Sequence, residues 1–107
     1  MRCDKCNSPV KPDIVFFGER LPQKFVETMD EISDEADLCL IMGTALAVSP
    51  FNTIPLHLKT NVPRVLFNMQ NTKDTGGIDF TEGRRHKLFV EGKCDLTIRK
   101  LVEDCGW

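Results

Sequence analysis

Several features that mark whole classes of protein are missing from this sequence of 107 residues. It has no excess of basic residues: the net charge is −2, whereas nucleic-acid binding requires a concentrated basic surface. It also has no apolar run near the ~20 residues that cross a bilayer, and no apolar segment that would mark a signal peptide. We therefore expect an intracellular protein, cytoplasmic or nuclear, that contacts neither nucleic acid nor a membrane directly.

Glycine-rich phosphate loops are missing as well. The sequence contains neither G-x-G-x-x-G nor a Walker motif, so a nucleotide bound here would lack its usual phosphate cradle within the chain.

The sequence contains an odd number of cysteines, five, and one of these lies inside an apolar run. This pattern indicates a reduced protein whose thiols bind metal or pack, not a disulfide framework.

The stretch that organises the chain is the unbroken apolar run 38–42, which ends at Gly43. Such a run predicts a strand buried on both faces of a parallel α/β sheet. Ligands bind such sheets beyond the carboxyl ends of the strands, so Gly43, Thr44 and Ala45 are a candidate nucleotide contact. A glycine after a strand also commonly just turns the chain, so this alternative stays open.

Two more strands are predicted, at 64–67 and 88–91. The first ends in Asn68, whose amide could bind ribose hydroxyls or satisfy loop backbone, and the second is followed by Gly92 and Cys94. If the strands are neighbours, their tips form one ligand-binding crevice.

The remaining segments read as helices and one loop. We expect a helix from Pro22 with a solvated acidic face, and a short helix capped by Ser49 that Pro55 kinks or shortens. A final helix is expected with Asp95 as its cap and Gly106 as its stop. Residues 69–85 show no apolar period and are expected to form a surface loop.

Cys3 and Cys6 form a C-x-x-C knuckle whose spacing lets both sulfurs reach one zinc ion. A redox pair is less favoured, because Pro9 and Pro12 prevent the helix that it requires. A structural zinc takes four ligands, and no second C-x-x-C or H-x-H pair follows. The ion is therefore completed by another chain, or the sequence starts inside a larger domain.

Residues 10–19 read as an extended, edge-like segment interrupted by Pro12 and ended by Gly18. Such a segment could pair with a substrate backbone by strand addition. Alternatively, Phe16 and Phe17 simply fill the core.

Five blocks of this sequence together resemble the C-terminal half of a sirtuin, an NAD-dependent protein deacylase. They read C-D-K-C at 3–6, V-K-P-D-I-V-F-F-G-E at 10–19, L-I-M-G-T-A-L-A-V-S-P-F at 40–51, V-L-F-N at 65–68 and G-K-C-D at 92–95, and they precede a closing C-G-W. The resemblance implies an α/β fold: half of a zinc-ribbon module over residues 1–9, then the C-terminal half of a Rossmann-like parallel sheet domain over residues 10–107.

The resemblance also implies roles for individual residues. The expected NAD contacts are Gly43, Thr44, Ala45, Asn68, Met69, Gln70 and Cys94; the expected acyl-lysine peptide contacts are Val15, Phe16, Gly18 and Glu19; the expected zinc ligands are Cys3 and Cys6. Ala45 stands where the family usually has a serine, which removes a hydroxyl near the cofactor.

No residue of this chain matches a catalytic residue of the family. His57 and His86 do not match its catalytic histidine, and the phosphate loop, the nicotinamide motif and the first cysteine pair are expected upstream. The resemblance therefore implies the NAD- and acetyl-lysine-binding half of an NAD-dependent protein deacetylase, inactive by itself and completed by an N-terminal half. The alternative is a non-catalytic fragment that acts through interactions or folds poorly.

Overall fold

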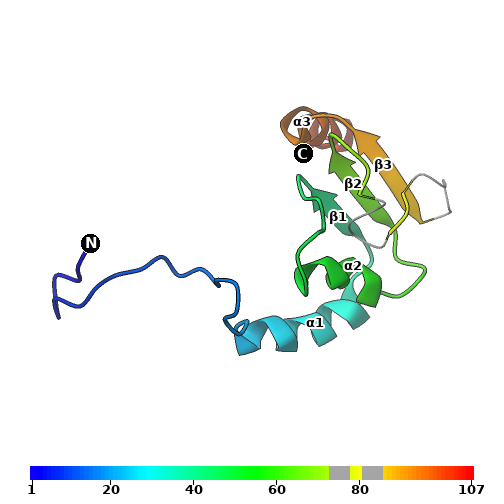
Figure 1. The fold of residues 1–107 in the computed structure, drawn as a ribbon. Helices are drawn as coiled ribbons and strands as arrows, with labels where there is room; N and C mark the ends of the chain where they lie inside the picture. Colours follow the sequence, from blue (N-terminus) through cyan, green and yellow to red (C-terminus); the bar gives the residue numbers. More distant parts are fainter. Residues whose placement is uncertain (73–77, 81–85) are drawn as a thin grey trace.

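The computed structural model describes residues 1–72, 78–80 and 86–107 (Figure 1). Its three strands form one parallel sheet in the order β1-β2-β3, which confirms the predicted parallel α/β sheet. The elements are α1 (Gln23–Glu35), β1 (Cys39–Met42), the 3₁₀ turn η1 (Phe51–Thr53), α2 (Ile54–His57), β2 (Arg64–Asn68), β3 (Lys87–Glu91) and α3 (Cys94–Cys105). This arrangement is consistent with a Rossmann-like fold.

The core lies on one face of the sheet. Ile41, Leu66 and Phe89 are directly opposite one another in the three strands and therefore share this face. Ile78 and Phe80 cover it and are only 2% and 3% exposed. The expectation of a surface loop over 69–85 is therefore wrong at these positions, because apolar residues without any period still close a core.

The remaining parts of that loop include Arg84 and Arg85, which lie outside the described residues. Thr72, before the first gap, is buried like Ile78 and Phe80. Thr72, Ile78 and Phe80 thus belong to the core layer, whereas Met69 and Gln70 are exposed.

The opposite face of the sheet is open along β1. Leu40 and Met42 point to this face and are 37% and 44% exposed, so the prediction that this strand is buried on both faces is wrong. The reason is its place at the edge of the sheet, since α3 packs over β2 on this side. A groove of about 570 Å³ remains between α3 and the strands.

Two predicted helix caps are also wrong. Ser49 precedes a 3₁₀ turn whose N-cap is Pro50, without a side-chain cap hydrogen bond. The N-cap of α3 is Lys93, so Asp95 lies in the first helical turn instead. The predicted end of α3 is confirmed: Gly106 adopts φ 70°, and its N–H is bonded back to the last turn.

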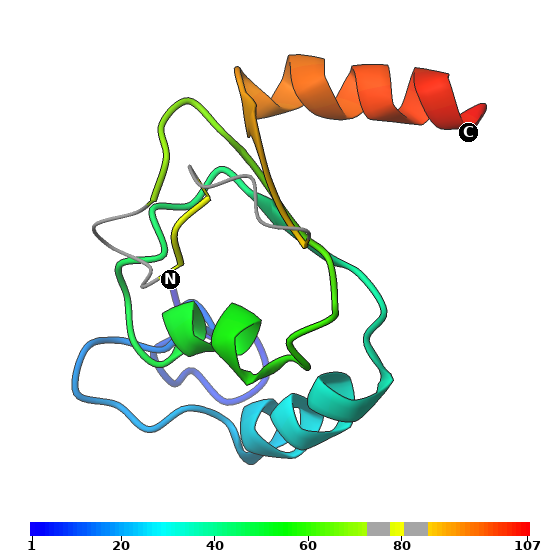
Figure 2. The same ribbon diagram turned by 90° about the vertical axis from the view of Figure 1, so that its right-hand side faces the viewer.

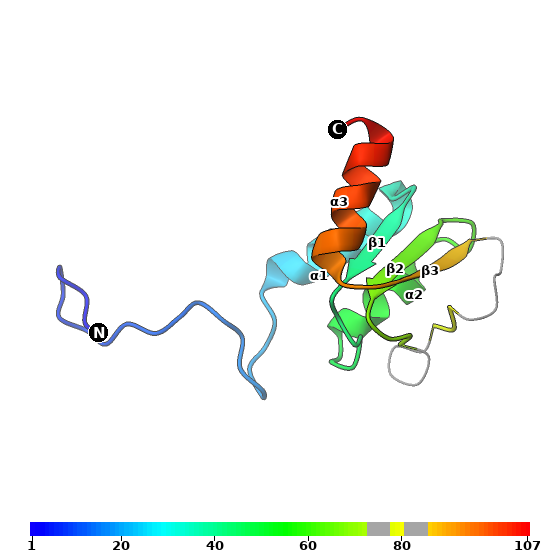
Figure 3. The ribbon, with the colours of Figure 1, turned by 90° about the horizontal axis from the view of Figure 1, so that it is seen from above.

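Residues 1–20, which we call the N-terminal arm, extend away from the sheet (Figures 1 and 3). Every arm residue is exposed except Cys3, which is half-buried. The arm makes the molecule elongated, with extents of 54 × 29 × 28 Å. Among the described residues, no helix is both long and apolar enough to cross a membrane.

Candidate ligand site at the strand tips

The carboxyl ends of the three strands are tied together at the end of β2. The carbonyl oxygen of Phe67 accepts two hydrogen bonds, one from the Gly43 N–H at 3.1 Å and one from the Cys94 thiol at 3.1 Å. The first donor follows β1 and the second begins α3 after β3. One carbonyl thus links the end of β2 to the loop after β1 and to the start of α3.

Asn68 makes the second set of links. Its side-chain Nδ2 donates to the Thr44 carbonyl at 3.0 Å, and its side-chain Oδ1 accepts from the Met69 N–H at 3.0 Å. Its backbone carbonyl accepts from the Gly92 N–H at 3.0 Å. The side-chain amide therefore forms hydrogen bonds with the loop backbone, which is one of the two roles that the sequence allows. A primary amide has two N–H groups and two lone pairs, so it retains one donor and one acceptor for a ligand.

The loop after β1 presents backbone at the strand tips. Gly43 has φ 59°, and a Cβ built there would lie 3.6 Å from the Cys94 sulfur, so a larger side chain would fill the space between the two. The Thr44 hydroxyl accepts from the Leu46 N–H at 3.1 Å and holds the loop closed. Ala45, next to it, is exposed.

The structure thus brings together the residues that the sequence places at one crevice. Gly43, Thr44, Asn68 and Cys94 belong to one bonded cluster, and Met69 and Gln70 are exposed beside it. Their roles toward a cofactor remain predictions. The Cys94 thiol hydrogen is used within the protein, consistent with packing and not with a nucleophile.

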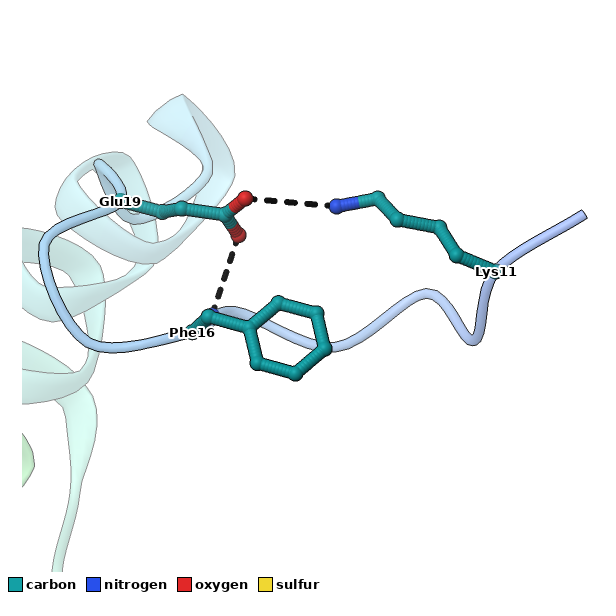
Figure 4. Close-up of polar contacts among 3 residues, drawn as sticks. All are labelled: Lys11, Phe16 and Glu19. Carbon is teal, nitrogen blue, oxygen red and sulfur yellow. Dashed lines mark hydrogen bonds and ion pairs between the residues drawn. The ribbon is translucent and has the colours of Figure 1, made fainter. Parts of the chain in front are cut away.

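Residues 16–19 form a turn at the end of the segment that the sequence predicts to be extended and edge-like, and residues 10–19 belong to no strand (Figure 4). The Glu19 N–H donates to the Phe16 carbonyl at 3.0 Å, and the Phe16 N–H donates to a Glu19 carboxylate oxygen at 3.0 Å. Lys11 lies 3.3 Å from the other carboxylate oxygen. The reciprocal pair of bonds closes the chain on itself where Gly18, with φ 88°, permits the turn.

The interpretation that both phenylalanines fill the core is also wrong. Phe16 is 48% exposed and Phe17 is 96% exposed. Together with the loop residues Val48, Ser49 and Pro50, the segment lines a groove of about 400 Å³. Substrate contact by this segment remains a prediction.

The cysteine knuckle is locally ordered. Cys3 donates its N–H to the Ser8 carbonyl at 2.9 Å and accepts from the Asn7 N–H at 2.8 Å. Hydrogen bonds from the side chain and backbone of Ser8, and from the Cys3 side chain, lower the pKa of the Cys6 thiol. In the described part of the chain, no group of three or more His, Cys, Asp or Glu residues could hold a metal, and zinc binding by Cys3 and Cys6 stays a prediction.

Neither histidine lies at the strand tips. The His57 ring is bonded through Nδ1 to the Thr53 carbonyl at 2.8 Å, at the end of α2. His86 immediately precedes β3, and its carbonyl accepts from the Arg64 N–H at 2.8 Å. Because the strands are parallel, His86 is at the opposite end of the sheet from Asn68.

One important residue was not identified from the sequence. Arg64 is 6% exposed, and its guanidinium donates to the carbonyls of Pro55 at 2.7 Å, Val62 at 2.6 Å, Leu58 at 2.9 Å and Lys59 at 3.2 Å. It therefore holds the connection from α2 to β2. An arginine that opens an apolar strand is the only sequence signal, and it does not reveal these partners.

The same guanidinium affects a neighbouring thiol. Burial raises the pKa of Cys39, whereas the positive charge of Arg64 acts in the opposite direction. Burial is the larger effect, so this thiol ionises less readily than an exposed one.

Comparison with known proteins finds one matching family model and several similar proteins. The family model described as the Sir2 family matches residues 1–50. The chain is 38% identical to the NAD-dependent protein deacetylase sirtuin-2 of Danio rerio (99% of this chain, 31% of that protein) and 40% identical to the NAD-dependent protein deacetylase sirtuin-3 of Mus musculus (99% and 30%).

A fungal relative agrees. The chain is 41% identical to the NAD-dependent protein deacetylase hst2-1 of Emericella nidulans, over 92% of this chain and 25% of that protein. It thus spans no more than about a third of the length of these relatives. The similarity extends over nearly the whole chain. The chain therefore belongs to the Sir2 family.

Proposed function

We propose that this chain provides the adenosine-binding strand tips and the peptide-binding segment of an NAD-dependent protein deacetylase. The observation that carries the proposal is the joining of three parallel strand ends at Phe67 and Asn68 by short hydrogen bonds. Ligands of parallel α/β sheets bind at this edge. The names of the relatives, all NAD-dependent deacetylases, support NAD as the ligand.

Each residue of the crevice has a distinct part in this proposal. Gly43 leaves the space between β1 and α3 open, so that a flat adenine ring can approach the backbone near Cys94. Asn68 offers the remaining donor and acceptor of its amide to ribose hydroxyls, while its bonds to Thr44 and Met69 fix its orientation. When bound, NAD would supply the ribose that receives the acyl group and would lose nicotinamide as the leaving group.

The acetylated-lysine protein or peptide would lie in the groove beside Val15, Phe16, Gly18 and Glu19. Glu19 supports this role by fixing the turn that ends the segment. A substrate backbone could pair with the residues before this turn, while the groove accepts a side chain. Val48 and Pro50 form the other wall.

We further propose that these 107 residues do not deacetylate a substrate by themselves. A general base must reach the proton that it removes, and both histidines are away from the strand tips. The rest of the site would come from the N-terminal half of such a domain. The exposed surface supports this: it is 8490 Å², whereas a compact monomer of 12.1 kDa exposes about 6,000 Å².

The organisation that follows from this proposal has two parts. Residues 1–9 form one half of a zinc-binding module, with Cys3 and Cys6 as its two ligands, and residues 10–107 form the cofactor-binding part. We propose an intracellular location.

Binding is tested separately from activity. An ¹⁵N-labelled chain is titrated with ADP-ribose and, as a control, with nicotinamide, and amide shifts are followed by NMR. We expect ADP-ribose alone to shift the amides of Gly43, Thr44, Asn68 and Cys94. Asn68→Ala should weaken binding roughly tenfold through the loss of its hydrogen bonds, whereas Lys100→Ala on α3 should not. Shifts confined to the arm would contradict the proposal.

Activity is tested by incubating the chain with NAD and an acetyl-lysine peptide and measuring the peptide mass. We expect no loss of the acetyl group. Deacetylation that depends on the chain would refute the claim of inactivity, but it would leave the assignment of the strand tips to be judged by the NMR titration.

A further inference from the structure

Two basic residues begin neighbouring strands at the end of the sheet opposite the strand tips. Arg64 is the first residue of β2 and Lys87 the first residue of β3, and the parallel register places them directly opposite each other. They share a face with the pair Leu66 and Phe89, two residues further along each strand, so their side chains leave the sheet on the core side. Figure 2 shows α2 on this side of the sheet and α3 on the other.

A pocket of about 370 Å³ lies beside these two residues, and we call it the amino-end pocket. Small-molecule sites in proteins measure roughly 300–1,000 Å³ and combine an apolar wall with a few polar groups. The apolar wall here consists of Pro55, Leu56, Leu58 and Ile78. The polar lining consists of Thr60, Arg64, His86 and Lys87, and the described lining includes no Asp or Glu.

The positive charge of Arg64 has no carboxylate partner among the described residues. Arg64 is 6% exposed, and its guanidinium donates only to the backbone carbonyls of the connection from α2 to β2. Carbonyl dipoles do not cancel a charge, and buried charges in proteins are normally paired. These bonds use four of the five N–H groups, so within the described chain one N–H on Nη1 is left for a ligand. The pocket therefore favours an anion.

Lys87 adds a second positive charge to the same pocket. It is half-buried, and none of the ion pairs between described residues includes it. An ammonium and a guanidinium N–H can each donate to one oxygen of a carboxylate, and such charge-assisted hydrogen bonds are stronger than neutral ones. The apolar wall suits a hydrocarbon body attached to that carboxylate.

We propose that the amino-end pocket binds a small monocarboxylate with an apolar body, whose carboxylate lies between Arg64 and Lys87. The body packs against Pro55, Leu58 and Ile78. The site is separate from the strand tips, because Arg64 and Asn68 stand at opposite ends of β2. Since the ligand joins the connection from α2 to the start of β3, its binding stabilises the folded chain.

The probe is 3-phenylpropionate, and two controls separate its charge from its body. The neutral 3-phenylpropionamide keeps the body and loses the charge, whereas acetate keeps the charge and loses the body. Each is titrated into the ¹⁵N-labelled 107-residue chain and followed by NMR. We expect 3-phenylpropionate to shift the backbone amides of Leu56, Thr60, Arg64 and Lys87. Both controls should bind at least roughly tenfold more weakly.

Two lysine variants locate the site. Lys87→Met keeps an apolar stem and removes the ammonium, so it should weaken the binding of 3-phenylpropionate roughly fivefold. Lys100→Met is the matched control, because Lys100 lines the groove between α3 and the strands, and it should leave the affinity unchanged. Unshifted amides of Gly43 and Asn68 in both variants would show that the fold is intact. Arg64 is left in place because it holds the connection from α2 to β2.

Thermal denaturation gives an independent readout. Addition of 3-phenylpropionate should raise the melting temperature of the unsubstituted chain, and it should raise that of Lys87→Met by less. The proposal would be overturned by equal affinities for the acid and its carboxamide, by shifts centred on Leu101 and Trp107 in the other groove, or by no saturable binding of the acid. An equal loss of affinity in Lys100→Met would overturn it as well. No NAD is present in these measurements, so their result is independent of the proposed function.

Discussion

The sheet and the N-terminal arm are stabilised in different ways. In the sheet, Ile41 and Leu66 are 6% and 0% exposed, so the removal of apolar surface from water supports that part of the fold. In the arm, every residue except Cys3 is exposed, and order depends on short-range hydrogen bonds. The comparison suggests that the sheet holds the cofactor residues rigidly, while the arm is easily reshaped by a peptide or a metal ion.

The arm contacts themselves are weak. The pair between Lys11 and Glu19 has side chains that are 66% and 46% exposed, and exposed ion pairs contribute about 0–1 kcal/mol. The Lys11 ammonium also lies 5.3 Å from the centre of the Phe16 ring, a contact that contributes on the order of 0.5–1 kcal/mol at exposed sites. The following variants test whether the sheet and arm differ as strongly as this reasoning predicts.

The largest effect is expected for Arg64→Met. The substitution removes the donors to the carbonyls of Pro55, Leu58 and Val62, and buried acceptors left without partners cost about 1–3 kcal/mol each. We expect a loss of about 4 kcal/mol or more in the free energy of unfolding, measured by urea denaturation. Arg2→Met, in the arm, should change it by less than about 0.5 kcal/mol. Equal losses of unfolding free energy in the two variants would contradict the proposed difference in stability between the sheet and the arm.

Leu66→Ala should follow, because it leaves a cavity at a fully buried position of the central strand. We expect a loss of about 3 kcal/mol in unfolding free energy. Phe17→Ala removes a larger side chain, yet it should cost less than about 0.5 kcal/mol, since that ring is 96% exposed. Thermal denaturation followed by circular dichroism measures both, and a larger effect in the arm would refute the assignment of the core.

The sequence was a good guide to the sheet because local signals and tertiary structure agree there. Apolar runs that end in Gly43 and Asn68 predict strands that the structure confirms to within one residue at each end, and these two ends then meet as expected. Where long-range contacts determine the structure, prediction from the sequence failed. The burial of Ile78 and Phe80, and the carbonyl partners of Arg64, depend on segments brought together only by the fold.

Cap predictions failed for a related reason. Asp95 is a good capping residue by type, but the Gly92 N–H is bonded to the Asn68 carbonyl, and the helix begins at Cys94. In the arm, the apolar run before Gly18 predicted an extended, edge-like segment; the described structure provides it with no neighbouring strand, and a turn closes its end at residues 16–19.

Asn68→Ala should have an intermediate effect at the crevice. It removes the bonds to the Thr44 carbonyl and from the Met69 N–H, at about 0.5–1.5 kcal/mol each. We expect a loss of about 1–2 kcal/mol in unfolding free energy and faster hydrogen exchange at residues 43–46. Asn68→Asp is the matched variant: it keeps the acceptor for Met69 but loses the donor to Thr44. Unchanged exchange in both variants would show that Asn68 does not hold the tips together.

A smaller effect should appear at alkaline pH. Because burial raises the pKa of Cys39 above that of an unfolded thiol, the folded chain binds a proton more tightly than the unfolded chain. The contribution is complete below the ordinary thiol pKa and is lost as the pH rises through the raised one, so stability should fall as the pH rises above the ordinary thiol pKa. Urea denaturation across this range measures it. Cys39→Val should reduce the slope of the unfolding free energy against pH, whereas Cys105→Ser should leave this slope unchanged.

The smallest global effect is expected for Glu19→Ala. The carboxylate accepts the Phe16 N–H and pairs with Lys11, but both contacts are local to the exposed arm. The unfolding free energy should change by less than about 0.5 kcal/mol, while hydrogen exchange at the Phe16 amide should accelerate. Glu19→Gln keeps an oxygen that can accept from the Phe16 amide. Hydrogen exchange at this amide should therefore be slower in Glu19→Gln than in Glu19→Ala. A global loss as large as that of Leu66→Ala would mean that the arm is part of the cooperative unit, and the contrast between the two regions would fail.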